Sequence, residues 1–332
     1  MTVPSTTSPL PPTPPPPPYR PRPATRPAVP STSSTPTQTA PLAPKAARHR
    51  PVRLRTRPPF TPAGTLPAMP TTHVVELGTA TVTKRYRSWD LGQPEREWRA
   101  LTLLAEHAPA LAPEPLRYAP AETPPSVTMS RLPGEPLSAP LTDAQLTGLV
   151  EAMTACQSAI PAADLAALPP RLLHPLDALK KLRAWSQRVP TPPDGPAAAA
   201  LDGARDWLGR PHLDTVFAAE PPPVLGTGDG NLANVLWDGS RARLVDFEFS
   251  GRGDRAYELA EVAEHVSAKN VLAPGDLLDR FELTASEKIR LPECRRLLAV
   301  FWLLALLSDD PDRPRNPPGT LVHQAEHLLT LL

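Results

Sequence analysis

Residues 226–253 read GTGDGNLANVLWDGSRARLVDFEFSGRG, and this stretch decides how the chain folds. Two apolar runs, V-L-W and R-A-R-L-V, flank an Asp-Gly pair at Asp238, a pattern typical of a β-hairpin. Because a hairpin brings its two ends together, we expect Asn234 at the entrance and Asp246 at the exit to be neighbours. Asp229 lies five residues before Asn234, on the loop that leads into the hairpin.

These side chains suggest a particular chemistry. The oxygen atoms of Asn234 and Asp246 suit Mg²⁺, which takes few protein ligands and leaves room for phosphate oxygens. Asp229, upstream on the loop, is then free to face a hydroxyl nucleophile. The stretch therefore predicts a site for phosphoryl transfer.

The first 70 residues differ from the rest in composition. They hold 22 prolines and nine Lys or Arg, but no Asp or Glu. With almost no large apolar residues, they cannot bury enough surface to offset their conformational entropy. We expect residues 1–70 to be a disordered, Pro- and Arg-rich tail with local polyproline II structure. A solvated spacer, a segment that touches anionic surfaces, and translation that begins at Met69 all remain open for it.

The charge of the body limits its partners. Subtracting the nine basic residues of the tail leaves 26 Lys and Arg against 34 Asp and Glu, a net charge of −8. An acidic body argues against nucleic acid as a partner and suits neutral or cationic small molecules. The longest apolar run, residues 297–307, is too short to span a membrane. Cys156 and Cys294 have no metal or redox spacing, so we expect reduced thiols in a cytoplasmic protein. We also expect no obligate protein partner.

The body is predicted to begin with strands and to end with helices. Alternating apolar residues over 72–87 favour a two-stranded hairpin, and a helix begins at Pro94. Two more strands lead to a stop at Leu132-Pro133-Gly134. Thr142 then opens a capping-box pattern, and helices are expected at 175–188 and 196–209.

Two later helices are predicted with specific buried faces. One begins at Asp254, a good N-cap, and should bury Leu259, Val262 and Val266. The last begins at Thr320 and should bury a face made of Leu321, Val322, Ala325, Leu328, Leu329 and Leu332.

The opening stretch resembles a known motif. Asp229…Asn234, followed by Asp246-Phe247-Glu248, is similar to H-G-D-x-H-x-x-N and then [IV]-D-[FW]-E of aminoglycoside phosphotransferases and their choline-kinase-like relatives. The resemblance covers residues 72–332. It implies the α+β, two-lobed fold of the protein kinases, with a small β-rich N-lobe and a larger, mainly helical C-lobe.

The resemblance also implies domains and an activity. Residues 71–134 would be the nucleotide-binding N-lobe, and residues 135–332 the C-lobe with the catalytic loop, the metal site and the acceptor site. The activity would be ATP- and Mg²⁺-dependent transfer of the γ-phosphoryl group to an alcohol. Asp229 would accept or orient the substrate hydroxyl, and Asn234 and Asp246 would hold Mg²⁺.

The nucleotide side of the site comes from the N-lobe. By resemblance, Lys84 would pair with the α- and β-phosphates, and Glu97, rather than Glu95, would steady it. Met129 and Arg131 would lie in the linker that meets the adenine ring. From the residues alone, Lys84 has a second interpretation, as a charged residue that protects an edge strand.

The chain also departs from the motif. Thr227 and Asn231 replace its two histidines, and Thr227 can donate one hydrogen bond to hold the loop but cannot replace an imidazole bridge. Glu248, Glu258 and Glu261 would help line the acceptor cleft, where acidic groups favour amino sugars or other cationic alcohols. For Glu258 and Glu261, an exposed helix face is the alternative.

Several functions remain open. The first is an active small-molecule kinase whose partner is a hydroxyl compound. The second is a catalytically silent nucleotide-binding or scaffold protein of the same fold, and the third is an interaction protein that works through its tail. The sequence identifies neither the acceptor nor the choice between ATP and GTP.

Overall fold

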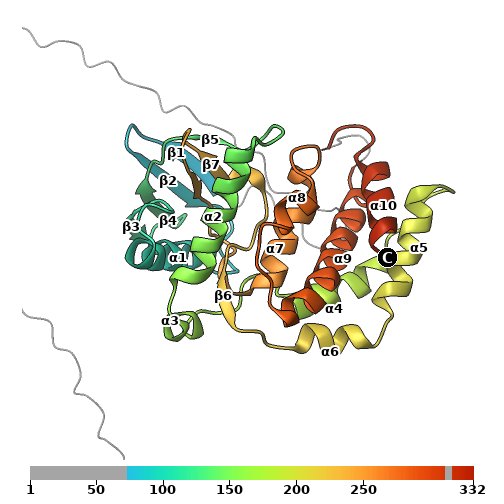
Figure 1. Cartoon of the computed structure of the whole chain (residues 1–332). Helices are drawn as coiled ribbons and strands as arrows, with labels where there is room; N and C mark the ends of the chain where they lie inside the picture. The colour runs from blue at the N-terminus through green and yellow to red at the C-terminus, as the bar shows by residue number, and fades with distance from the viewer. Residues whose placement is uncertain (1–72, 311–315) are drawn as a thin grey trace, which may run out of the picture. The chain divides into compact units, whose positions relative to one another are not determined.

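A computed structural model describes residues 73–310 and 316–332 of the chain. The predicted disordered tail, residues 1–70, lies outside these described residues. The described part forms a small antiparallel sheet with one helix, followed by a larger helical part (Figure 1). This is the α+β, two-lobed architecture that the sequence predicts.

The small lobe is built on a four-stranded antiparallel sheet in the order β1-β2-β4-β3. The predicted hairpin over 72–87 is confirmed, since β1 and β2 pair from His73↔Tyr86 to Leu77↔Val82. The strands are β1 (His73–Leu77), β2 (Thr81–Tyr86), β3 (Pro115–Ala119) and β4 (Ser126–Ser130).

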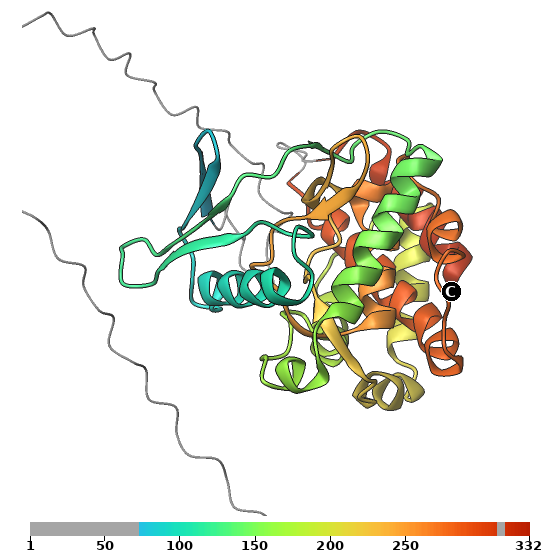
Figure 2. The same ribbon diagram turned by 60° about the vertical axis from the view of Figure 1, so that its left-hand side comes forward.

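One helix, α1 (Gln93–His107), lies along this sheet (Figure 2). Pro94 stands in its first turn, as expected for a helix start. Its buried face carries Ala100, Leu101 and Leu104, and it also carries Glu97, which is fully buried. An acid on an apolar helix face needs a partner, because a buried charge without one is strongly unfavourable.

The larger lobe is mainly helical. Its helices are α2 (Asp143–Ala159), α3 (Ala162–Ala166), α4 (Pro175–Ser186), α5 (Pro196–Leu208), α6 (His212–Ala218), α7 (Arg255–Glu264), α8 (Pro274–Leu278), α9 (Ala285–Leu307) and α10 (Thr320–Leu331). The capping box at Thr142 forms as predicted, since its hydroxyl accepts from Gln145 N and Gln145 Oε1 accepts from Thr142 N. Among the described residues, no helix is both long and apolar enough to cross a membrane.

Two predicted buried faces differ from the structure. Helix α7 ends at Glu264, so Val266 lies in the 3₁₀ helix η2 (Val266–Ala268) and is only partly buried. On α10, Val322 and Leu329 are 43% and 42% exposed. The buried face of α10 is rotated because Gln324 packs inward and donates its side-chain amide to Ala299 O of α9 at 2.9 Å.

The central hairpin forms as predicted from β7 (Val235–Trp237) and β8 (Ala242–Leu244). The Asp238 carboxylate closes its turn by accepting from the backbone of Ser240 and Arg241, both at 2.9 Å. A third strand, β5 (Glu135–Pro136), pairs with β7 directly after the predicted stop. The chain turns between β4 and β5 at Gly134 (φ 117°), where the sequence predicts the stop.

A second pair of strands joins the two ends of the quoted stretch. β6 (Pro223–Gly226) and β9 (Gly251–Asp254) are antiparallel, with Gly226 opposite Gly251. A Cβ on Gly251 would lie 2.5 Å from Pro169 O and 2.8 Å from Arg171 N, so only glycine fits there. This pairing holds the loop and hairpin between two fixed ends.

We therefore expect Gly251→Ala to lower the free energy of unfolding by about 1–3 kcal/mol, the usual range for overpacking against atoms that cannot move aside. Gly275→Ala is the matched control, because no atom lies within 4 Å of its added Cβ. Urea unfolding measures both variants. Equal stabilities for the two would contradict the close approach at Gly251.

Candidate functional site

Lys84 joins the two lobes. It lies on β2, is 6% exposed, and its Nζ is 2.7 Å from Glu97 Oε2 and 2.7 Å from Asp246 Oδ1. Tyr86, two residues along the same strand, donates its hydroxyl to the same Glu97 oxygen at 3.1 Å. The edge-strand interpretation of Lys84 is wrong, because β2 lies between β1 and β4 and the side chain is buried.

The carboxylates around Lys84 keep it charged. Burial alone would lower the pKa of Lys84, but Asp246 and Glu97 raise it above its ordinary value. Burial would likewise raise the pKa of Asp246, yet the nearby Lys84 and His73 lower it below the usual range. Both groups are therefore ionised near neutral pH, which makes the contact a partly buried ion pair.

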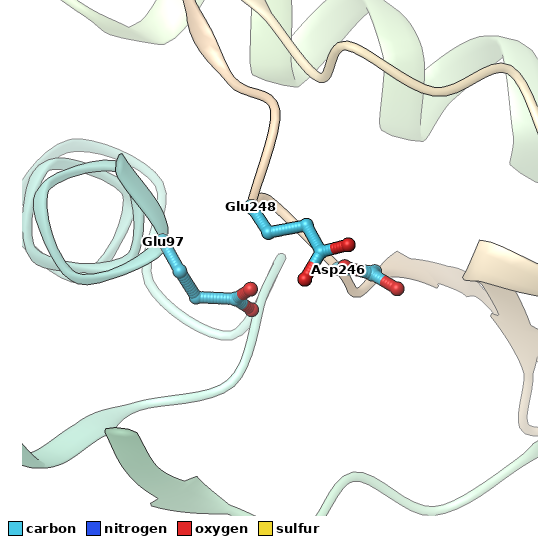
Figure 3. Close-up of side chains that lie close together, drawn as sticks. All are labelled: Glu97, Asp246 and Glu248. Atoms are coloured by element: carbon cyan, nitrogen blue, oxygen red, sulfur yellow. The ribbon is translucent and has the colours of Figure 1, made fainter. Parts of the chain in front are cut away.

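A third carboxylate completes this cluster. Figure 3 shows Glu97 approaching from α1, while Asp246 and Glu248 come from the segment after β8. One ligand oxygen of each lies within 4.8 Å of the others. The Glu248 carboxylate is buried and accepts from His73 Nδ1 of β1 at 2.8 Å. Glu248 therefore contacts the small lobe, and its place in an acceptor cleft stays a prediction.

Asp246 has an unusual backbone conformation. Its φ is 70°, in the left-handed region that few non-glycine residues adopt. The hairpin leads directly to it, since Val245 N donates to Asn234 O at 2.9 Å. Asn234 thus accepts this hydrogen bond and Asp246 directly follows its donor, so the two ends of the hairpin are neighbours. Backbone strain of this kind is found most often at functional sites.

Asp229 lies on the loop after β6 and is held by its own loop. Its Oδ1 accepts from Asn231 N at 3.0 Å, and its Oδ2 accepts from Asn234 Nδ2 at 3.2 Å. Burial raises the pKa of Asp229 to about 7, with further contributions from Asp246 and Glu261. The arrangement fixes the direction of the carboxylate.

Two glycines let this loop pack closely. A Cβ on Gly228 would lie 2.4 Å from Phe249 O, and one on Gly230 would lie 2.5 Å from Glu261 O. Asp229 is thus set between two points of close backbone contact. Together with Asn231 and Asn234, it lines a pocket whose other walls include residues of α2 and α7.

The two residues that replace the histidines of the motif have different partners. The hydroxyl and the backbone N of Thr227 donate to Glu258 Oε2 at 3.3 and 2.9 Å, so the predicted hydrogen bond of Thr227 is present. The Asn231 side chain accepts from Ala233 N and caps the 3₁₀ helix η1 (Leu232–Asn234). Only the backbone of Asn231 contacts Asp229.

The acids of α7 are neutralised inside the protein. Arg171, which is fully buried, donates to Glu258 Oε1 at 2.6 Å and to Glu261 at 2.7 and 2.8 Å. The exposed-face interpretation of Glu258 and Glu261 is therefore wrong. Because Glu258 and Glu261 are paired with Arg171, their charges no longer favour a cationic acceptor. Nothing in the loop sequence around Arg171 signals this role, because its partners lie 87 and 90 residues away.

Met129 and Arg131 stand apart from these clusters. Met129 is buried on β4, opposite Val82 of β2. Arg131 follows β4, and its guanidinium donates to Gly78 O, at the turn between β1 and β2, at 3.1 Å. The structure thus brings together Lys84, Glu97 and Asp246, and separately Asp229 and Asn234.

The small antiparallel sheet, the helical lobe and the buried pair of Lys84 and Glu97 define a protein-kinase-like fold. The chain belongs to the phosphotransferase enzyme family, whose model matches residues 71–323. A search of curated proteins found no match.

Similar solved structures share this fold at low sequence identity. A choline/ethanolamine kinase family protein from Mesorhizobium loti is 17% identical with a TM-score of 0.55, covering 82% of this chain and 87% of its own. A GDP complex of an aminoglycoside 2'-phosphotransferase-IIIa variant is 16% identical with a TM-score of 0.54, covering 82% and 92%. A thermostable variant of aminoglycoside phosphotransferase APH(4)-Ia, in complex with ADP and hygromycin B, is 16% identical with a TM-score of 0.53, covering 80% and 91%.

We expect Lys84→Met to destabilise the fold by about 3–5 kcal/mol, because it leaves the buried carboxylate of Glu97 and the partly buried one of Asp246 without their cation. Lys180→Met, on the exposed surface of α4, is the matched control and should change stability by less than about 0.5 kcal/mol. Denaturant unfolding measures both. A similar small effect for the two variants would show that the contact across the lobes adds nothing to stability.

Proposed function

We propose that this protein is a small-molecule kinase that uses Mg²⁺ and transfers the γ-phosphoryl group of ATP, or of another nucleoside triphosphate, to an alcohol. The observation that carries the proposal is the contact of Lys84 with both Glu97 and Asp246. It brings a buried cation of the small lobe next to the acidic loop of the large lobe. A lysine can pair with phosphate oxygens, and a carboxylate beside it can hold the metal ion that bridges them, so this arrangement suits the binding of a triphosphate.

The small lobe would bind the nucleotide. In this assignment residues 71–134 form the nucleotide-binding lobe, and residues 135–332 carry the catalytic loop, the metal site and the acceptor site. Lys84 would meet the α- and β-phosphates, Glu97 would hold its ammonium in place, and Met129 and Arg131 would lie near the base. The ADP and GDP in the two aminoglycoside phosphotransferase structures support a nucleotide.

The residues present fit a magnesium ion. The side-chain nitrogen of Asn234 bonds Asp229, which leaves its carbonyl oxygen for a cation. Lys84 keeps Asp246 ionised. An amide oxygen and a carboxylate are hard donors of the kind Mg²⁺ prefers. Bound there, Mg²⁺ would neutralise charge on the phosphate oxygens.

Asp229 would act on the acceptor. The substrate oxygen attacks the γ-phosphorus, a new O–P bond forms, and the bond between that phosphorus and the bridging oxygen of the nucleoside diphosphate breaks. The hydroxyl proton passes to a carboxylate oxygen of Asp229. Asn231 N and Asn234 Nδ2 orient that carboxylate before the substrate arrives, so the chain itself supplies the positioning on which such reactions depend.

One observation favours a second candidate, a silent nucleotide-binding protein of the same fold. The side chain of Asn231 turns to Ala233 N and does not replace the imidazole of the motif at Asp229. The two candidates differ in one result. A silent protein would gain thermal stability from nucleotide but would form no diphosphate with any acceptor.

Asp229→Ala should lower kcat at least a hundredfold, because general base catalysis contributes about 10²–10⁴-fold. Nucleotide should still raise the melting temperature of this variant. A coupled assay of ADP formation, with aminoglycosides, choline, homoserine and macrolides as acceptors, measures turnover. Asp202→Ala, at an exposed position of α5, is the control. Unchanged turnover in Asp229→Ala would refute its assignment as the base.

Asp246→Ala should abolish the part of the nucleotide-induced melting shift that depends on Mg²⁺, because it removes the only charged side chain assigned to the proposed metal site. Each variant serves as its own control, with nucleotide in excess Mg²⁺ compared with nucleotide in EDTA. A Mg²⁺-dependent shift as large as that of the unmodified protein would place the metal elsewhere.

A further inference from the structure

An imidazole lies beside Asp229 although the motif histidines are missing. It belongs to His265, which directly follows α7 and is 8% exposed. Its Nε2 is 3.5 Å from Asp229 Oδ1. This is longer than an ordinary N–H···O hydrogen bond of about 2.7–3.2 Å. Contacts at catalytic groups are often long before substrate binds and tighten when it does. In sequence, His265 lies 36 residues beyond Asp229, outside the loop where the motif has its histidines.

The neighbours of the ring decide which nitrogen carries its proton. Ser267 N donates to His265 Nδ1 at 3.0 Å. The Ser267 hydroxyl lies 2.7 Å from the same Nδ1. Because that nitrogen is already an acceptor, the hydroxyl donates to it while accepting from Leu232 N at 2.9 Å. A nitrogen that accepts from both groups holds no proton. A neutral His265 therefore carries its single N–H on Nε2, the atom that faces Asp229.

The surroundings also fix the ring in space. Trp302 of α9 meets it edge to face, with ring centroids 4.6 Å apart. Burial lowers the pKa of His265 to about 3, so the ring stays neutral. The Ser267 hydroxyl ties the same segment to η1 through Leu232. The turn after α7 therefore contacts the catalytic loop at two points, the backbone N of Leu232 and the carboxylate of Asp229.

The acceptor positions of Asp229 can be accounted for. A carboxylate offers about four lone-pair positions. Asn231 N takes one on Oδ1, and Asn234 Nδ2 takes one on Oδ2. His265 Nε2 lies 3.5 Å from the same Oδ1, close enough for its N–H to take the second position there. The remaining position is on Oδ2, where a substrate hydroxyl can be received.

We infer that His265 is a positioning residue: its Nε2–H holds the Asp229 carboxylate from the opposite side of the loop and takes the place of the imidazole that the loop lacks at Asn231. The inference rests on the proposed function, because it assigns His265 a part in orienting the catalytic base. It also explains how a chain with Thr227 and Asn231 in its motif keeps a directed carboxylate.

Two variants separate this role from a purely structural one. His265→Asn keeps an acceptor near the place of Nδ1 for Ser267 N but has no N–H at the place of Nε2. His265→Gln keeps an N–H that reaches the place of Nε2 but loses the acceptor. We expect kcat to fall about tenfold in His265→Asn, with KM for nucleotide and acceptor within twofold. His265→Gln should keep kcat within about threefold, even if it melts at a lower temperature.

His323→Asn, at an exposed position of α10, is the matched control and should leave kcat and melting temperature unchanged. The inference is overturned if kcat simply follows melting temperature across the His265 variants. It is also overturned if His265→Asn turns over like the unmodified protein.

A second measurement does not depend on activity. Nitrogen-15 NMR of the imidazoles in the full chain, with His265 assigned by its loss in His265→Asn, should show a neutral ring protonated on Nε2. A ring protonated on Nδ1, or on both nitrogens, would overturn the inference whatever the assay gives. If the unmodified protein instead transfers phosphate to none of the acceptors while the ring has the expected tautomer, the proposed function fails and the geometry stands.

Discussion

The site depends on the ion pairs that the buried ammonium of Lys84 makes with two carboxylates. The ammonium satisfies a carboxylate of the small lobe, Glu97, and one of the large lobe, Asp246, at the same distance of 2.7 Å. Removing water from three charged groups is unfavourable by several kcal/mol, so each is stable there only in the presence of the others. The His73–Glu248 contact adds a second link between β1 and the segment after β8. The two lobes therefore meet through charge as well as through apolar packing.

The large lobe neutralises its own acids in the same manner. Arg171 pairs with Glu258 and Glu261, while Glu264 accepts from Arg295 at 2.8 Å and contacts His327 at 2.6 Å. The acidic charge of the body is therefore partly internal, and it says little about the charge of a substrate. Through Glu258, the Arg171 network also reaches Thr227 and the loop that carries Asp229. The ion pair of Arg171 with Glu258 thus helps to hold this loop in place.

Much of the fold was predictable because its signals are local. The hairpin turn at Asp238, the helix start at Pro94 and the capping box at Thr142 each depend on residues a few positions apart. The rotated face of α10 was not predictable, because it depends on a hydrogen bond from Gln324 to a carbonyl of α9. The pairing of β5 with β7 likewise depends on the close approach of Gly134 to Trp237.

The sequence by itself determined the order of the elements and the residues of the motif, Asp229, Asn234 and Asp246, because spacing along a chain is local information. Only the tertiary structure decided their partners. Arg171 pairs with Glu258, and the imidazole after α7 lies beside Asp229. Both contacts join segments that are tens of residues apart in the sequence. Such pairings follow from how helices and loops pack against one another, and no short pattern in the sequence encodes that packing.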